Sequence, residues 1–122
     1  MFELAIPVLH VADAAAAEAF YRDALGFEVL FAYRPDPESA NPCYLGLRRD
    51  AARMHVSSFS GDAVSGGVVY LLVGDVDALH RELCARGVPI DLPPTDQTWG
   101  NRELYVKDPD GNTLRFVTQR GG

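Results

Sequence analysis

Two stretches of the chain place apolar side chains at the spacing of an amphipathic helix. The first, at residues 13–25, opens on Asp13, whose side chain is suited to capping the first turn, and is followed by Gly26. The second, at residues 75–86, repeats this arrangement, with an aspartate at its start and Gly87 directly after its end. The pattern therefore predicts two helices, each bounded by an aspartate and a glycine.

Runs rich in apolar, β-branched and aromatic residues surround the two helices and predict strands. One run precedes each helix, at residues 4–9 and 68–73. The others follow the helices in two groups of three, at residues 27–33, 43–47 and 53–59 and at residues 88–92, 103–107 and 113–119. This order predicts an α+β fold of two tandem βαβββ modules.

Short matches between the two halves indicate a duplication. Val11-Ala12-Asp13 corresponds to Val73-Gly74-Asp75, and Leu25-Gly26-Phe27 corresponds to Arg86-Gly87-Val88, both at an offset of about 60 residues. We expect one domain over residues 1–122. Its expected parts are a first module over about residues 1–60, a linker at residues 61–67 and a second module over about residues 68–122.

The composition fits a small globular protein and argues against several classes of partner. Of the 122 residues, 48% are hydrophobic and 23% are charged, which suffices for one buried core. The net charge of −6 comes from scattered acidic residues, so we expect no nucleic acid partner. The charge suits a cationic ligand, although on charge alone its main role is to keep the protein soluble. The apolar N-terminal run is too short to span a membrane. Cys43 and Cys84 fit no zinc-binding spacing and are expected to be reduced thiols in the cytoplasm.

Longer motifs make the sequence similar to a known superfamily. They are Ile6-Pro7-Val8-Leu9, AFYRDALGF at residues 19–27, WGNREL at residues 99–104 and KDPDGNTLRFV at residues 107–117. Together with the duplicated module, they resemble the glyoxalase/bleomycin-resistance/dioxygenase superfamily, also called vicinal oxygen chelate proteins, and most of all its bleomycin-resistance proteins. The WGNREL motif is the narrower signal, because the LGF and DPDGN segments recur throughout the superfamily.

The resemblance implies a curved mixed sheet that encloses a pocket, and a domain-swapped homodimer. In the resistance proteins, the first module of each chain is completed by the second module of its partner, so that two pockets lie at the interface. Pro7 resembles the proline near the crossover of the swapped N-terminal strand.

Enzymes of the superfamily hold a divalent metal with side chains from the first and last strands of each module. The matching first-strand positions here are Ile6 and Val68, and the last-strand positions are His55 and Arg115. Apolar side chains cannot coordinate a metal, and a guanidinium repels one. We therefore expect a protein without a metal, a cofactor or enzymatic activity.

Aromatic residues are the positive signal for binding. Trp99, the only tryptophan, stands in a loop that contains Pro, Thr and Gly, where contact with a ligand is a more usual role than core packing. Four further aromatic residues, each of which also fits an ordinary core, would join it in a slot for a flat heteroaromatic group: Phe31, Tyr33, Tyr44 and Phe59.

Two polar residues complete the candidate ligand-binding set. His55 either faces the ligand or is satisfied by a backbone carbonyl. Arg115 is expected to form a structural salt bridge, with contact to an anionic ligand group as the alternative.

The sequence thus predicts a cytoplasmic homodimer that binds and sequesters bleomycin or a related cationic glycopeptide drug without modifying it. The 35–42 loop looks longer than in the resistance proteins. Acidic loop residues that would attract the cationic tail of such a drug are Asp36, Glu38, Asp62 and Asp96. The alternatives are a metal-dependent enzyme of the superfamily, either a glyoxalase-like lyase or a ring-cleaving dioxygenase, and a protein that binds another small metabolite.

Overall fold

The computed structural model describes residues 1–120, so residues 121 and 122 of the expected second module lie outside the described residues. The first half contains β1 (Val8–His10), α1 (Ala14–Ala19), η1 (Phe20–Ala24), β2 (Glu28–Tyr33), β3 (Tyr44–Arg49) and β4 (Ala52–Ser57). The second half contains β5 (Val68–Leu72), α2 (Val76–Ala85), β6 (Leu92–Asp96), β7 (Arg102–Lys107) and β8 (Thr113–Thr118). This order confirms the predicted α+β fold of two βαβββ units.

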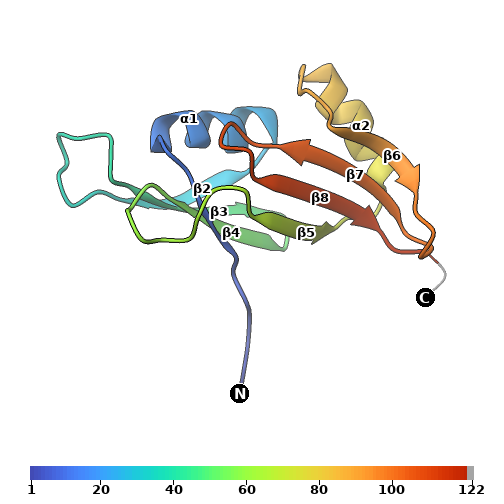
Figure 1. Ribbon diagram of the computed structural model, residues 1–122, viewed down its shortest axis with the longest axis horizontal. Helices are drawn as coiled ribbons and strands as arrows, with labels where there is room; N and C mark the ends of the chain where they lie inside the picture. Colours follow the sequence, from blue (N-terminus) through green and yellow to red (C-terminus); the bar gives the residue numbers. More distant parts are fainter. Residues whose placement is uncertain (121–122) are drawn as a thin grey trace.

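Each half forms one four-stranded mixed sheet. The strand order is β1-β4-β3-β2 in the first sheet and β5-β8-β7-β6 in the second sheet. In both sheets the first strand of the half pairs in parallel with the last, and the other neighbours are antiparallel. Helix α1 packs against the first sheet and α2 against the second (Figure 1). The two halves therefore share one topology, and no helix in residues 1–120 is long and apolar enough to cross a membrane.

The helix boundaries follow from local capping. The carboxylates of Asp13 and Asp75 accept hydrogen bonds from backbone N–H groups in the first turns of α1 and α2. Gly26 and Gly87 come directly after the helical segments with φ angles of 73° and 76°, which glycine adopts without steric cost. The expected helix at residues 13–25 differs in one respect, because its last turn widens into the π-helical segment η1.

The expected strand at residues 4–9 is wrong in its position. The structure begins β1 at Val8, and the preceding residues extend away from the body of the protein (Figure 1). A strand needs a neighbour to pair with, and residues 1–6 have none in this chain. Pro7 marks the transition, because its carbonyl accepts a hydrogen bond from the backbone N–H of His55 at 2.8 Å.

The expected strand at residues 88–92 is also displaced. Val88 packs into the core instead, and the strand β6 comes later and contains Pro93 and Pro94. Proline lacks the N–H that a central strand requires, but β6 is the outermost strand of its sheet and can accommodate it. The remaining strands lie within one or two residues of their predicted bounds.

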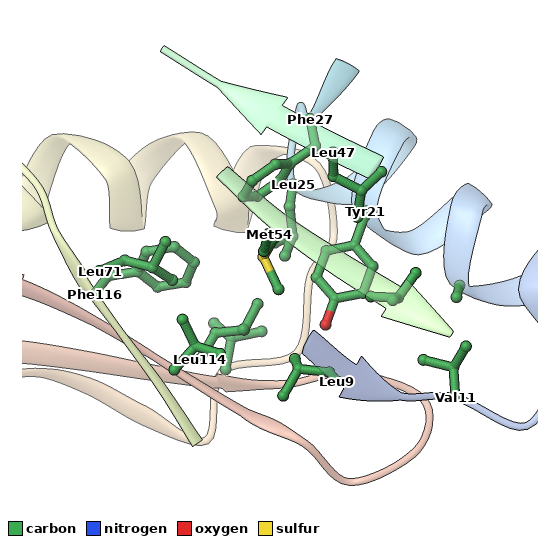
Figure 2. Packing of buried hydrophobic residues seen from close by; sticks show 14 of the residues in the cluster. Leu9, Val11, Tyr21, Leu25, Phe27, Leu47, Met54, Leu71, Leu114 and Phe116 are labelled. Carbon is green, nitrogen blue, oxygen red and sulfur yellow. The ribbon is translucent and has the colours of Figure 1, made fainter. Parts of the chain in front are cut away.

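One hydrophobic core runs through both halves. Figure 2 shows side chains of the first half facing side chains of the second half in a single packed cluster. Its largest fully buried members are Tyr21, Leu25, Leu45, Leu47, Met54, Leu83, Leu104 and Leu114. Because the core is shared, neither half buries its apolar side chains alone.

Polar contacts of the DPDGN turn reinforce the junction between the halves. The buried carboxylate of Asp108 accepts hydrogen bonds from the hydroxyl of Tyr21 at 2.8 Å and from the side-chain amide of Asn112 at 2.9 Å. Asn112 also donates to the backbone carbonyl of His10 at 2.9 Å. Burial, together with the charge of Asp108, raises the pKa of the Tyr21 hydroxyl, so it remains protonated and donates.

We expect Tyr21→Phe to lower the free energy of unfolding by about 2 kcal/mol, because it removes a buried hydrogen bond to a carboxylate. Urea denaturation measures this change. Tyr33→Phe is the matched control, because the Tyr33 side chain is exposed and its hydroxyl makes no hydrogen bond within residues 1–120. Equal effects of the two substitutions would contradict a junction role for Tyr21.

Candidate functional site

A row of polar and aromatic side chains crosses the second sheet. Tyr70 on β5 pairs with Arg115 on β8, and Arg115 pairs with Tyr105 on β7, so the three side chains share one face. Glu103 lies two residues before Tyr105 and therefore points to the same face. Together with Trp99, which precedes β7, these residues form what we call the tryptophan cluster.

Glu103 is the centre of the tryptophan cluster. Its side chain is 1% exposed, and its carboxylate accepts hydrogen bonds from Tyr105 at 2.6 Å, from the indole N–H of Trp99 at 2.9 Å and from Tyr70 at 3.3 Å. Burial acts to raise the pKa of Glu103, but these three bonds and the charge of Arg115 outweigh it and lower the pKa below its usual range. The carboxylate is therefore charged and satisfied.

Trp99 lies in a tight turn between β6 and β7 and is 61% exposed. The turn is closed by hydrogen bonds from the N–H of Gln97 to the carbonyl of Asn101 and from the N–H of Gly100 to the carbonyl of Gln97. Since Glu103 holds the indole N–H, the ring is positioned although most of its surface is free. Trp99 is thus not a core residue.

Arg115 does not form the expected structural salt bridge with any carboxylate of residues 1–120. Its guanidinium lies over the ring of Tyr105, 4.9 Å from the ring centre, and its buried Nε has no hydrogen-bond partner within the described chain. Glu103, the acidic residue on the same face, accepts hydrogen bonds from Tyr105, Trp99 and Tyr70 instead.

A second group, the first-sheet cluster, lies on β2, β3 and β4 and the segment that follows β4. Its members are Phe31, Tyr33, Tyr44, His55 and Phe59. Phe31 and Tyr44 are stacked with ring centres 6.2 Å apart, and Tyr33 and Phe59 are stacked at 6.1 Å. Four of these residues, with Asp62, line a shallow hollow of about 410 Å³. Phe31 and Tyr33 are 45% and 58% exposed, so they are not core residues.

His55 is held by a side chain and not by the backbone carbonyl that sequence reasoning allowed. The Tyr44 hydroxyl lies 2.7 Å from His55 Nδ1, and the rings of Phe31 and Tyr44 meet the imidazole edge-on. Burial, and then the positive charge of Arg53, lowers the pKa of His55 below its usual value. The imidazole is therefore neutral at pH 7.

Gly46 explains how Phe31 lies flat across the first sheet. The two residues pair across β3 and β2, and a Cβ atom on Gly46 would be 2.1 Å from a ring carbon of Phe31. Only glycine leaves room for the ring at this position.

Sequence reasoning placed all the aromatic residues in one slot, but one chain does not assemble it. The first-sheet cluster and the tryptophan cluster belong to different sheets, and no aromatic pair within residues 1–120 joins them. Figure 1 shows β2 and the adjoining 34–43 loop toward one end of the molecule and the turn between β6 and β7 at the other. Each chain thus presents two half-sites.

Sequence reasoning missed three members of the tryptophan cluster, namely Glu103, Tyr70 and Tyr105. Glu103 stands inside the WGNREL motif, four residues after Trp99. The period of two along a strand places Tyr105 on the same face as Glu103. Tyr70 becomes visible only when the pairing of β5 with β8 is known.

The expected metal-ligand positions are apolar on the first strand of each half. Ile6 precedes β1, and Val68 opens β5. Residues 1–120 contain no group of three or more His, Cys, Asp or Glu side chains arranged to hold a metal ion. A further hollow of about 450 Å³ lies between the halves, where Arg49 and Glu82 form a bidentate ion pair at 2.9 and 2.8 Å.

Two βαβββ units, each with a four-stranded mixed sheet, define a small α+β protein with an internal duplication. The chain belongs to the glyoxalase superfamily, because residues 1–122 match the family described as glyoxalase superfamily protein. This finding confirms the resemblance seen in the motifs. No curated protein matches the sequence.

Solved structures extend this family assignment. A bleomycin-binding protein from bleomycin-producing Streptomyces verticillus, complexed with copper(II)-bleomycin, is 32% identical, with a TM-score of 0.73 and coverage of 99% of this chain and 98% of that chain. A superfamily member from Sphaerobacter thermophilus is 28% identical, with a TM-score of 0.73 and coverage of 98% and 100%. A bleomycin resistance determinant encoded on transposon Tn5 is 23% identical, with a TM-score of 0.79 and coverage of 98% and 100%, and shows the same fold.

The lowered pKa of Glu103 predicts an acid transition in the fluorescence of Trp99, the only tryptophan. Because the folded-state pKa lies below the unfolded one, the carboxylate stabilises the cluster above pH of about 4.3, and this stabilisation is lost as the pH falls through the folded-state pKa. Emission should therefore stay constant from neutral pH to about pH 4.3 and change below it.

Glu103→Gln should shift the emission already at neutral pH and remove the acid transition. Glu38→Gln, the same substitution on an exposed loop, is the control and should leave both unchanged. Circular dichroism at each pH separates this transition from unfolding. An acid transition that persists in folded Glu103→Gln would contradict the assignment.

Proposed function

We propose that the protein binds and sequesters bleomycin or a related glycopeptide drug in the cytoplasm, without modifying it. The observation that carries this proposal is the state of Trp99, whose ring is 61% exposed while a buried carboxylate holds its N–H. A large aromatic ring that is both exposed and held in place loses little conformational entropy when a flat ligand stacks on it.

The first-sheet cluster supports the same function. Its stacked pairs present aromatic faces around a shallow hollow, and contiguous exposed apolar surface of this kind marks binding sites. Stacking of a ligand ring against each aromatic contact contributes about 0.5–1.5 kcal/mol beyond burial. The similarity to a protein that was solved with copper(II)-bleomycin supports the choice of drug class.

The acidic loop residues contribute unequally to a site for a cationic tail. Asp96 is engaged by Arg102 and Arg120 at 3.1 and 3.3 Å and is thereby neutralised. Asp62, in contrast, lines the first-sheet hollow, where it accepts a hydrogen bond from the Ser57 hydroxyl at 2.8 Å. In the proposed complex, the cationic part of the ligand therefore lies at the first-sheet cluster.

We further propose a homodimer in which the tryptophan cluster of one chain faces the first-sheet cluster of its partner. This arrangement would complete the half-sites that one chain keeps apart. Apolar side chains of β5 that are exposed in the single chain fit such an interface: Val68 at 53%, Tyr70 at 48% and Leu72 at 62%. The extended residues 1–6 before Pro7 fit an arm that reaches the partner.

Trp99→Ala should weaken binding of metal-free or copper-loaded bleomycin by about 2 kcal/mol, because it removes the main stacking surface. Titration calorimetry measures the affinity, and in the unaltered protein the tryptophan emission should change on binding. The protein should still fold, with a modest fall in the thermal midpoint, because the substitution removes one of three hydrogen bonds to the buried Glu103 carboxylate while the lost ring surface is mostly exposed.

Val64→Ala is the control for Trp99→Ala, since it removes an apolar side chain that is 80% exposed and outside both clusters. It should leave the affinity unchanged. Unaltered affinity in folded Trp99→Ala would remove the main support for drug binding.

Light scattering at micromolar concentration should give about twice the 13.3 kDa chain mass. Leu72→Asp should shift the protein toward the monomer and weaken drug binding with it, because a charge would be buried at the interface. Val64→Asp adds the same charge away from β5 and should remain dimeric. A monomer that still binds the drug tightly would contradict the shared site.

A further inference from the structure

The guanidinium of Arg115 packs over an aromatic ring but forms no ion pair within residues 1–120. The residue sits between Tyr70 and Tyr105 in the row across the second sheet, and its carbon CZ lies 4.9 Å from the ring centre of Tyr105. Packing over an aromatic ring restricts the orientation of the planar group. The N–H groups of Arg115 are therefore presented in a defined direction.

These N–H groups lack acceptors within residues 1–120. Nε is buried and has no hydrogen-bond partner, and the guanidinium takes part in no ion pair of the described chain. The arginines that do form ion pairs are Arg22, Arg48, Arg49, Arg86, Arg102 and Arg120. The two terminal Nη groups also make no hydrogen bond within residues 1–120 but are not buried, so they are the donors that an anionic group can reach.

Glu103 does not supply the missing acceptor. Its two oxygens already accept from Tyr105, Trp99 and Tyr70, and moving them toward Arg115 would break these bonds. The carboxylate attracts Arg115 through space but makes no hydrogen bond to it. The guanidinium of Arg115 therefore lacks a hydrogen-bond acceptor within residues 1–120.

We propose that Arg115 binds an anionic oxygen group of the aromatic ligand, a carboxylate, sulfate or phosphate. Two oxygens of such a group match the planar donor fork of a guanidinium. This inference goes beyond the proposed function and shares with it only the stacking of a flat ring on Trp99. Arg115 lies over the ring of Tyr105, and the hydroxyl of Tyr105 and the indole of Trp99 donate to the same carboxylate, so the bound acidic group lies in the same cluster as the stacked ring.

The two clusters therefore differ in the charge of the ligand group that each one attracts. The tryptophan cluster takes the end that carries a flat ring and an acid, while Asp62 at the first-sheet cluster favours a cationic end. Among flat aromatic molecules of similar shape, the tryptophan cluster therefore binds those that carry an acidic group more tightly than uncharged ones.

The test compares 2-naphthoate with 2-naphthamide, which have the same flat ring and nearly the same shape but differ in charge. Titration calorimetry is run on the unaltered protein, on Arg115→Gln, and on Arg81→Gln, which removes the same charge from an exposed position on α2. The unaltered protein should bind the naphthoate more tightly than the amide. Arg115→Gln should weaken naphthoate binding by about tenfold and leave naphthamide binding unchanged. Arg81→Gln should affect neither.

Equal naphthoate affinity in Arg115→Gln and the unaltered protein would overturn the anion subsite, while naphthamide binding that depends on Trp99 would still support the aromatic site. If Trp99→Ala left the binding of both probes unchanged, or if neither probe bound, the anion subsite would fall, whereas the drug-binding function is decided separately by the bleomycin titration of Trp99→Ala. Arg115→Lys gives a second variant if Arg115→Gln does not fold. It keeps the charge without the planar fork, so naphthoate binding should weaken less than in Arg115→Gln but remain measurably below that of the unaltered protein.

Discussion

Each sheet of this protein has two faces but only one helix to cover them. Helix α1 packs on the first sheet and α2 on the second, and the side chains on these covered faces merge into the one core that both halves share. No helix of residues 1–120 covers the opposite faces, and several of their large side chains stay exposed, as Phe31 and Tyr70 do. Both candidate clusters lie on these uncovered faces, so the site follows directly from the number of helices per sheet.

The shared core also sets the distance between the clusters. The DPDGN turn ties β8 to the first half through Asp108 and Tyr21, which fixes how the two sheets sit relative to each other. In that arrangement the two uncovered faces do not meet in one chain. A site that uses both clusters therefore needs a second copy, which is the physical basis for the proposed dimer.

A buried carboxylate gives the tryptophan cluster its order. Without its three donors, Glu103 would be a charge with an uncompensated desolvation penalty, so Trp99, Tyr70 and Tyr105 are held where they satisfy it. None of these bonds involves Arg115, whose buried Nε has no acceptor within residues 1–120. Glu103 thus positions the aromatic side chains of the tryptophan cluster, and the cationic Arg115 remains available beside them. The first-sheet cluster is held instead by ring stacking and by the contact of Tyr44 with His55.

Sequence alone determined the features that depend on neighbours in the chain. The caps at Asp13 and Asp75, the glycines after the helices and the repeated order of elements are local, and the structure confirms them. The positions of β1 and β6 were misjudged because pairing partners and edge positions, which decide whether a segment extends or tolerates proline, come from residues far away. Trp99 was visible as an exposed loop aromatic, whereas Glu103 and the unpaired state of Arg115 required tertiary structure. Hydrogen bonds between strands depend on register, and register is decided when the whole sheet packs on its helix.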